Sequence, residues 1–322
     1  MFEGKEKLIV LTGPTASGKT ALAVKLAEKY SAEIVSADSR QCYRGMDIGS
    51  GKDIGEYGSV PYHLIDIEDP GSEYNLARFA RDARKAIDSI AGRGKLPLLC
   101  GGSVLYCDAV ISGYELPGGE PDPAFRAQLD SMPLSELEQR LRAAGVSENF
   151  RDWGNRNRMR RALEIALSGG VRDENISRYQ TLVLGVFVPR PLLRERIAAR
   201  LDVRLENGMV EEVQALHEEK GVSWERLESF GLEYKRCAEY LQGKMDFQTM
   251  RDILLTDIRQ FAKRQDIWFR KLEKKGIDIY WLEEDRFNAA CCLIDGFLKG
   301  EVLPPPGRRM MDTCYGARQK QD

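Results

Sequence analysis

Short apolar runs alternate with segments of helical periodicity along most of the chain. The runs predict buried strands at residues 8–11, 34–35, 96–100, 182–188 and 277–282. After the first run, Leu22 and Leu26 belong to an apolar set that recurs at helical spacing. Strands that alternate with helices are typical of a parallel sheet covered by helices on both faces. We therefore expect an α/β fold.

The pattern changes in three places. Between residues 114 and 173 the strand signal disappears, and the Pro- and Gly-rich residues 116–123 lead into a helical insertion. A long helix is predicted at 247–274, where one stripe comprises Met250, Leu254, Ile258, Phe261, Trp268 and Leu272. The chain then ends in a polar segment. These changes divide the chain into a core at 1–115 and 173–303, an insertion at 116–172 and a tail at 304–322 that we predict to be disordered.

Composition limits the chemistry more than it limits the fold. The 322 residues are 43% hydrophobic and 30% charged, and no apolar run approaches membrane-spanning length, so we expect a cytoplasmic globular protein. Seven cysteines without a C-x-x-C pair favour reduced thiols over a disulfide framework or a zinc site. The two histidines exclude clustered histidine metal sites and argue against Ser-His-Asp chemistry. Catalysis is expected from carboxylates, hydroxyls, Lys, Arg and a metal.

A phosphate-binding loop lies between the first predicted strand and the first predicted helix. It matches G-x-x-x-x-G-K-[ST] and comprises Gly13, Pro14, Thr15, Ala16, Ser17, Gly18, Lys19 and Thr20. Such a loop directs backbone N–H groups and a helix N-terminus at phosphate oxygens. Lys19 is expected to pair with a terminal phosphate and Thr20 to hold Mg²⁺. The pattern predicts a di- or triphosphate ligand without distinguishing the two.

Polar residues follow two more predicted strands. Asp38 follows strand 34–35 and is expected at the same sheet edge as the phosphate loop, as a magnesium ligand or a general base, with a turn or N-cap role as the alternative. Gly101 and Gly102 permit close backbone approach before Ser103 starts a helix. Asp66 is interpreted as a solvated loop residue.

Basic residues form three groups. Four arginines fall within residues 156–161, and Arg196, Arg200 and Arg204 are spaced to share one side of a helix. The long helix adds Arg259, Lys263, Arg264, Arg270 and Lys271. For each group taken alone, salt bridges to neighbouring acids are an alternative. Together, in a chain of net charge −2, the groups favour a polyanion surface, most simply for nucleic acid.

These motifs together resemble the tRNA dimethylallyltransferase (tRNA isopentenyltransferase) family. The matching segments, in the family's order, are 13–20, 36–49, 63–66, 101–106, 161–164, 208–213 and 262–270. The resemblance implies a P-loop NTPase-like sheet and transfer of a dimethylallyl group from dimethylallyl diphosphate to N6 of adenosine 37 in tRNA, with release of pyrophosphate. It also implies Mg²⁺ as cofactor, and we expect a monomer.

The same resemblance assigns roles to residues. Asp38 would be the base, Thr15 would contact the leaving diphosphate, and Arg158 and Arg200 would add positive charge there. The helical insertion would clamp the anticodon arm. The implied tRNA contacts are Asp38, Ser39, Arg40, Gln41, Ser103, Arg126, Asn157, Arg158, Met159, Arg160, Arg161, Phe230, Gly231, Leu232, Glu233, Tyr234 and Lys235.

The sequence departs from the family mainly in segments that would face tRNA. Glu233-Tyr234-Lys235-Arg236 stands where the family usually has Gly-Tyr-Lys-Glu, and Gly154-Asn155 where it usually has Asn-Asp.

Three alternative functions stay open: prenyl transfer to free AMP or ADP, a small-molecule kinase that uses ATP, and a nucleotide-gated RNA-binding protein. The long basic helix argues against a mononucleotide acceptor, which needs no such surface.

Overall fold

The computed structural model describes residues 5–113, 123–147, 150, 152–167 and 177–312. The chain divides into two compact units, one formed by Met1–Ile111 with Arg178–Asp322 and the other by Ser112–Ser177. The predicted insertion at 116–172 falls within the second unit. The two units are described in turn.

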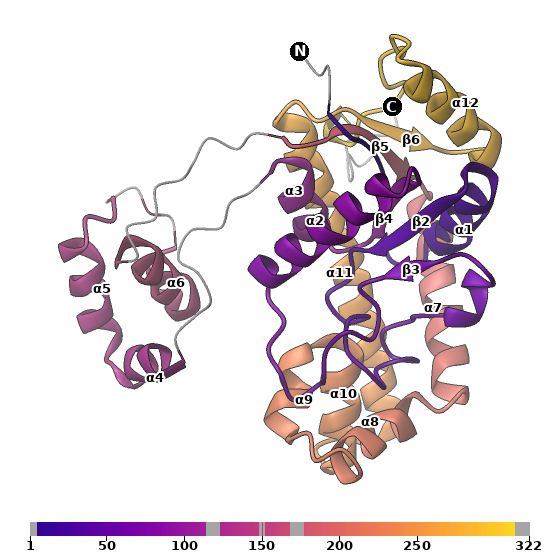
Figure 1. Cartoon of the computed structure of the whole chain (residues 1–322). Helices are drawn as coiled ribbons and strands as arrows, with labels where there is room; N and C mark the ends of the chain where they lie inside the picture. The colour runs from indigo at the N-terminus through magenta and orange to yellow at the C-terminus, as the bar shows by residue number, and fades with distance from the viewer. Residues whose placement is uncertain (1–4, 114–122, 148–149, 151, 168–176, 313–322) are drawn as a thin grey trace, which may run out of the picture. The chain divides into compact units, whose positions relative to one another are not determined.

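The first unit is built on a six-stranded sheet in which every pair of neighbouring strands is parallel (Figure 1). The strand order is β3-β2-β4-β1-β5-β6, so the predicted parallel α/β fold is confirmed. The bounds are β1 Lys7–Thr12, β2 Ala32–Ser36, β3 Tyr62–His63, β4 Leu96–Gly101, β5 Gln180–Val186 and β6 Ile279–Leu282. Five strands coincide with the predicted runs, whereas the two residues of β3 are too few to produce a recognisable period.

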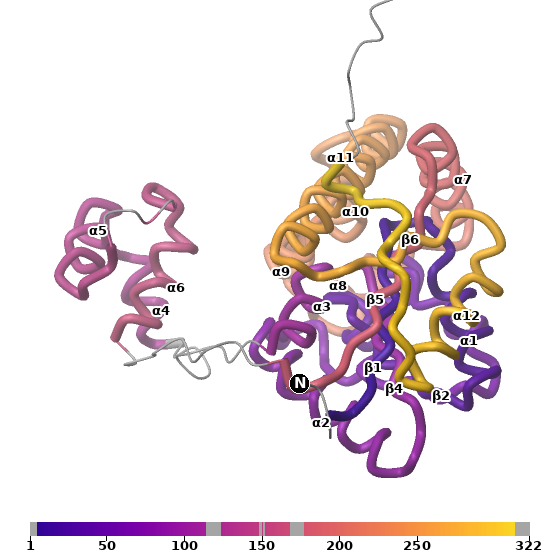
Figure 2. The backbone as a smooth tube through the Cα atoms, turned by 90° about the horizontal axis from the view of Figure 1, so that it is seen from above, coloured from indigo at the N-terminus to yellow at the C-terminus, as the bar shows by residue number. Residues whose placement is uncertain are grey.

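Alternate residues of the strands enter two separate hydrophobic cores. Ile9 and Leu11 of β1 pack against α1 (Lys19–Tyr30) and α12 (Arg286–Lys299), which lie side by side (Figure 1, Figure 2). Leu8 and Val10 point to the other face, where α2 (Leu76–Gly92) and α3 (Val104–Ile111) contribute to the core. The two faces explain why these strands read as continuous apolar runs.

The remaining α-helices of this unit lie C-terminal to β5, and two short 3₁₀ helices complete it. The α-helices are α7 Arg190–Glu206, α8 Met209–Glu218, α9 Trp224–Phe230, α10 Leu232–Leu241 and α11 Phe247–Lys274, and the 3₁₀ helices are η1 Ile54–Tyr57 and η2 Met310–Asp312. The prediction of a helix at 247–274 is confirmed. Asp246 caps its first turn by accepting a hydrogen bond from the Thr249 N–H at 2.7 Å. Met250, Leu254, Ile258 and Leu272 are buried as predicted, but Phe261 and Trp268 are only half-buried.

The second unit has its own small core. Its helices are α4 Pro123–Ser131, α5 Leu134–Ala143 and α6 Arg156–Leu167, and its fully buried side chains include Leu129, Leu137, Leu141, Met159 and Leu163. In the part of the chain that is described, no helix is long and apolar enough to cross a membrane.

The prediction that the chain is disordered from residue 304 is wrong for residues 304–312. The buried Glu273 carboxylate accepts hydrogen bonds from the N–H groups of Met310 and Met311 at 2.9 and 2.6 Å, and the Met310 side chain is buried. Polar, Pro-rich composition did not reveal these bonds because they depend on one carboxylate far back in the sequence. Residues 313–322 of the predicted tail lie outside the described residues.

We predict that Glu273→Ala lowers the free energy of unfolding by about 3 kcal/mol, because it leaves buried N–H donors without acceptors. The third of these donors is Trp281 Nε1, at 2.8 Å from Glu273 Oε1. Urea unfolding followed by tryptophan fluorescence measures the change. Glu284→Ala, at an exposed position, is the control, and a loss of less than about 0.5 kcal/mol at Glu273 would match an ordinary surface change and contradict the anchoring role.

Candidate functional site

A pocket of about 530 Å³ opens where β1, β2 and β4 end. This volume is in the range of small-molecule sites, and the position is where open parallel sheets bind ligands. Its lining comes from widely separated segments and includes Thr15, Lys19, Thr20, Asp38, Ser39, Arg40, Gln41, Gly101, Ser103, Arg200, Arg204, Phe230, Gly231, Leu232, Glu233, Tyr234, Phe261 and Arg264. The structure therefore brings together most of the predicted site residues of the first unit.

The phosphate loop turns sharply from β1 into α1. Gly18 precedes the helix with φ 81°, a left-handed conformation that favours glycine. Lys19 extends along the loop, and its Nζ lies 3.5 Å from the carbonyl oxygen of Pro14. Burial lowers the pKa of Lys19, since the protein interior disfavours its charge. The result is a helix N-terminus beside a cation that no carboxylate contacts in the described structure.

A second cation reaches the same end of the pocket from α7. The Arg200 guanidinium donates a hydrogen bond to the Thr15 hydroxyl. Burial, followed by repulsion from Arg204, lowers the pKa of Arg200 to about 10, so Arg200 stays charged at neutral pH. The prediction that Arg200 and Arg204 share one side of a helix is confirmed, since both line the pocket. Arg204 is buried. The phosphate end of the pocket is thus strongly positive.

Asp38 occupies a short turn after β2, and only one of its carboxylate oxygens is engaged within the described structure. Oδ1 accepts a hydrogen bond from the Arg40 N–H at 2.9 Å. The turn is tied to β4, because Ser39 N–H donates to Ser103 Oγ at 3.2 Å and Ser103 N–H donates to the Ala37 carbonyl at 3.2 Å. A Cβ at Gly101 would lie 2.1 Å from that carbonyl oxygen, so this approach requires glycine. Asp38 Oδ2 is left to face a ligand.

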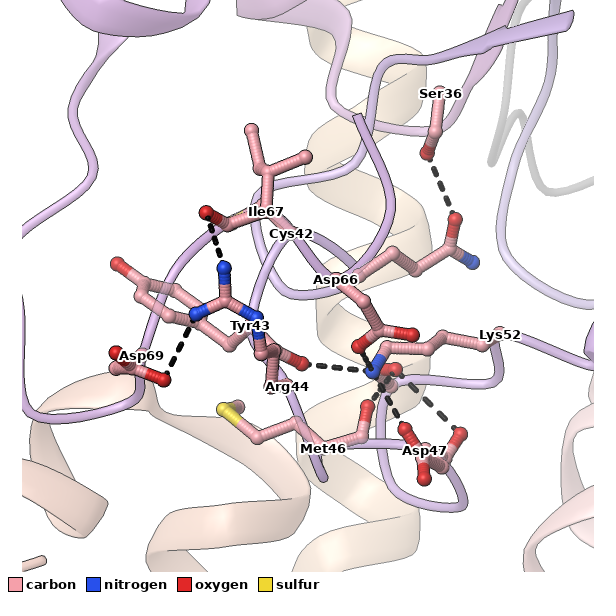
Figure 3. A network of polar contacts seen from close by, with 12 residues as sticks. Ser36, Cys42, Tyr43, Arg44, Met46, Asp47, Lys52, Asp66, Ile67 and Asp69 are labelled. Carbon is pink, nitrogen blue, oxygen red and sulfur yellow. Dashed lines mark hydrogen bonds and ion pairs between the residues drawn. The ribbon is translucent and has the colours of Figure 1, made fainter. Parts of the chain in front are cut away.

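The loop after this turn, residues 42–53, is held by buried polar contacts. Gln41 accepts from Ser36 Oγ at 2.8 Å and donates to the Gly51 carbonyl at 2.9 Å. The Lys52 side chain is 1% exposed, and its ammonium group donates to the Tyr43 carbonyl at 2.7 Å and to Asp47 and Asp66 (Figure 3). Asp66 is therefore an ion-pair partner rather than the solvated loop residue that we predicted.

A second carboxylate binds the backbone of the same loop. Glu212 accepts hydrogen bonds from the N–H groups of Asp47, Ile48 and Gly49 at 2.7, 2.6 and 3.1 Å. It also accepts from the Tyr234 hydroxyl at 2.9 Å, and that hydroxyl accepts from the Ser50 N–H at 3.0 Å. Tyr234 is 1% exposed. Tyr234, a residue predicted to contact tRNA, thus uses its hydroxyl to hold the loop that lines the pocket.

The other predicted residues of segment 230–235 divide into two groups. Phe230, Gly231, Leu232 and Glu233 line the pocket, and the Arg40 guanidinium lies 5.4 Å from the centre of the Phe230 ring. Burial raises the pKa of the Glu233 carboxyl. Lys235 is not among the lining residues and pairs with Glu239 at 3.8 Å on α10.

The arginines of the insertion have protein partners. Arg158 pairs with Asp152, Arg160 with Asp130, and Arg126 and Arg161 both with the buried Glu164. Arg156 instead donates to carbonyl oxygens at the end of α4. Their density indicated a polyanion surface because no acid is adjacent in sequence, but acids elsewhere in the insertion supply salt bridges. The Met159 side chain is 0% exposed in the insertion's core, and the place of Met159 among the tRNA contacts stays a prediction. Asn157 is exposed, and the role of Arg158 at the leaving group stays a prediction.

Three residues that fix the site were missed from the sequence: Lys52, Glu212 and Gln265. Glu212 and Gln265 bond mainly to backbone groups of other segments, whereas Lys52 bonds to one carbonyl and two carboxylates. Glu212 and Gln265 lie in segments that matched the family, but their type and spacing gave no signal of these partners.

Comparison with known proteins agrees with this geometry. The IPP transferase family model matches residues 41–272, and the isopentenyl transferase model matches residues 6–57. The chain is 45% identical over 280 residues to tRNA dimethylallyltransferase 1 of Geotalea uraniireducens, covering 86% of this chain and 93% of the relative. It is 46% identical over 290 residues to tRNA dimethylallyltransferase 2 of Shewanella sediminis, covering 88% and 96%.

Solved structures show the same fold. The full-length tRNA isopentenylpyrophosphate transferase from Bacillus halodurans superposes with a TM-score of 0.68 at 34% identity, covering 92% of this chain and 96% of that one. A eukaryotic dimethylallyltransferase acting on tRNA reaches a TM-score of 0.79 at 24% identity, covering 94% and 82%, which is a likeness of fold. With a family model matched over residues 41–272 and close relatives aligned over most of their length, this chain belongs to the IPP transferase family, which includes the tRNA dimethylallyltransferases.

Proposed function

We propose that this protein transfers a dimethylallyl group from dimethylallyl diphosphate to N6 of adenosine 37 in tRNA and releases pyrophosphate. The observation that carries the proposal is the pairing, in one pocket, of a cationic phosphate end with an Asp38 carboxylate that has one oxygen unoccupied by described residues. The names of the relatives support the choice of tRNA and of the dimethylallyl donor.

The phosphate end suits the departure of pyrophosphate. As the bond between the allylic carbon and the diphosphate oxygen breaks, its electron pair moves to that oxygen and the carbon becomes cationic. Lys19, Arg200 and the amides at the start of α1 stabilise the growing negative charge, and Thr15 positions Arg200. Because Lys19 and Arg200 are half-buried and partly desolvated, water screens these interactions less than it would at an open surface.

The other end suits an exocyclic amine that must lose a proton. The N6 lone pair of adenine is delocalised into the ring, so attack on the allylic carbon depends on removal of a nitrogen proton as the carbon–nitrogen bond forms. Asp38 Oδ2 is the acceptor for that proton. The adenine must leave its stack to enter the pocket, and Phe230 with Arg40 forms an aromatic and cationic wall beside Asp38.

The residues present fit a magnesium ion that the donor itself helps to hold. Among the described residues there is no cluster of three or more His, Cys, Asp or Glu suited to a metal, so a protein cage is absent there. The Thr20 hydroxyl lines the pocket and would hold Mg²⁺ together with diphosphate oxygens and water. When bound, the ion would neutralise charge on the leaving group.

The deciding experiment follows a labelled prenyl group. Purified protein is incubated with labelled dimethylallyl diphosphate and tRNA that lacks the modification, and position 37 is examined by mass analysis. We expect label in tRNA, with AMP competing poorly. Efficient labelling of AMP would replace tRNA by a mononucleotide acceptor, and phosphoryl transfer from ATP without prenyl transfer would replace the reaction by that of a kinase.

Asp38→Ala is expected to lower the rate of transfer about 10²–10⁴-fold, the usual contribution of a general base, while the Kd for tRNA changes by only a few fold. Single-turnover transfer and equilibrium tRNA binding are measured on the same preparation. Asp38→Asn keeps the hydrogen bond to the Arg40 N–H and is the matched control for folding. Transfer by either variant at a rate near wild type would refute the assignment of the base.

Arg200→Ala is expected to lower the single-turnover rate about 10²–10³-fold, because a charge that stabilises the leaving group is lost. Arg194→Ala changes an exposed arginine on the same helix, outside the pocket, and should leave the rate unchanged. A loss confined to tRNA affinity would show that Arg200 contacts the tRNA backbone instead. The same measurement on Arg158→Ala tests its predicted role.

A further inference from the structure

One buried amide joins the two ends of the pocket. Gln265 lies on α11 and is 3% exposed. Its Oε1 accepts a hydrogen bond from the Thr15 N–H at 2.9 Å, and its Nε2 donates to the Gly102 carbonyl at 2.7 Å. Both polar atoms of the side chain are therefore used, each by the backbone of a different segment.

The two partners belong to opposite ends of the proposed reaction. Thr15 is in the phosphate loop, and its hydroxyl accepts the hydrogen bond from Arg200. Gly102 immediately precedes Ser103, which binds the Asp38 turn through the Ser39 N–H. The chain of contacts thus runs from the leaving-group cation, through Gln265, to the turn that carries the base.

No other described hydrogen bond makes this link directly. The pairing of β1 with β4 ends at Thr12 and Gly101, where Thr12 Oγ1 donates to the Gly101 carbonyl at 3.0 Å. Beyond that point, in the described part of the chain, the hydrogen bonds between the phosphate loop and residues 102–103 pass through Gln265. The contact is close, since a Cβ at Gly102 would lie 2.9 Å from Nε2.

We propose that Gln265 is a positioning residue that sets the separation between the phosphate loop and the Asp38 turn, and so between the donor carbon and the acceptor nitrogen. The inference rests on the proposed prenyl transfer. Transfer needs the reacting atoms to be about 3–3.5 Å apart and aligned, and a misplacement of about 1 Å costs on the order of 100-fold in rate.

A misplaced acceptor also changes the products. If the allylic carbon–oxygen bond breaks while N6 is out of reach, water can attack the carbon instead. The water oxygen then forms the new bond and releases a proton to solvent, which gives dimethylallyl alcohol and pyrophosphate. Loss of positioning therefore raises the ratio of pyrophosphate released to prenyl groups transferred above one.

The test compares Gln265→Met with the wild type. Methionine keeps the length and volume of the side chain and removes both hydrogen bonds. We expect the rate of transfer per folded enzyme to fall about 10- to 100-fold, with the Kd values for pyrophosphate and tRNA within threefold of wild type and the product ratio above one. Gln242→Met, at the residue that follows α10, also removes half-buried amide contacts, to Glu228 and the Ala238 carbonyl, but lies outside the pocket lining and should change neither quantity.

Gln265→Glu tests the hydrogen bond to Thr15 separately from the one to Gly102. It is also the variant to measure if Gln265→Met does not fold. It keeps an acceptor for the Thr15 N–H but cannot donate to the Gly102 carbonyl when ionised, and we expect an intermediate loss of rate with a raised product ratio. An unchanged rate, or a lower rate with one pyrophosphate per transferred group, would overturn the positioning role. Absence of transfer by the wild type would instead overturn the proposed function, so the two failures are distinct.

Discussion

The site depends on two half-buried cations that line the pocket, and no carboxylate is bonded to either in the described structure. Lys19 contacts a carbonyl oxygen and Arg200 a hydroxyl, and burial lowers the pKa of both. A desolvated charge without an anionic partner costs free energy, so these two cations are electrostatically unfavourable in the folded protein. A diphosphate supplies the missing negative charge. The same two cations favour the polyphosphate part of a ligand at this end of the pocket.

Around this pocket, polar side chains hold the loops that line it. Glu212 binds three consecutive N–H groups of the loop 42–53, Lys52 binds a carbonyl and two carboxylates near it, and Gln265 joins two loops. Each satisfies groups that would otherwise be unpaired in the interior. The loops that follow parallel strands form no strand-to-strand hydrogen bonds. Side chains from other parts of the chain bind their backbone groups instead.

The sequence allowed much of the fold to be predicted and part of the site. The phosphate loop and the helix 247–274 have local signatures, and Asp38 was found because it directly follows a strand. Gln265 could not be found in this way, since its partner Thr15 is 250 residues away. The sequence did not reveal the acidic partners of the arginines near residue 158, because Asp130 and Asp152 meet them only in the folded insertion. The prediction of disorder failed at residues 304–312 for the same reason, since Glu273 gives no compositional signal.

The insertion carries its own hydrophobic core and its own buried acid, Glu164, which holds two arginines. Its stability therefore draws little on the sheet that bears the chemistry. Substitutions on its surface can accumulate without disturbing the phosphate loop or Asp38. Such modularity lets the helices of the insertion diverge in sequence while the residues around the phosphate loop stay the same.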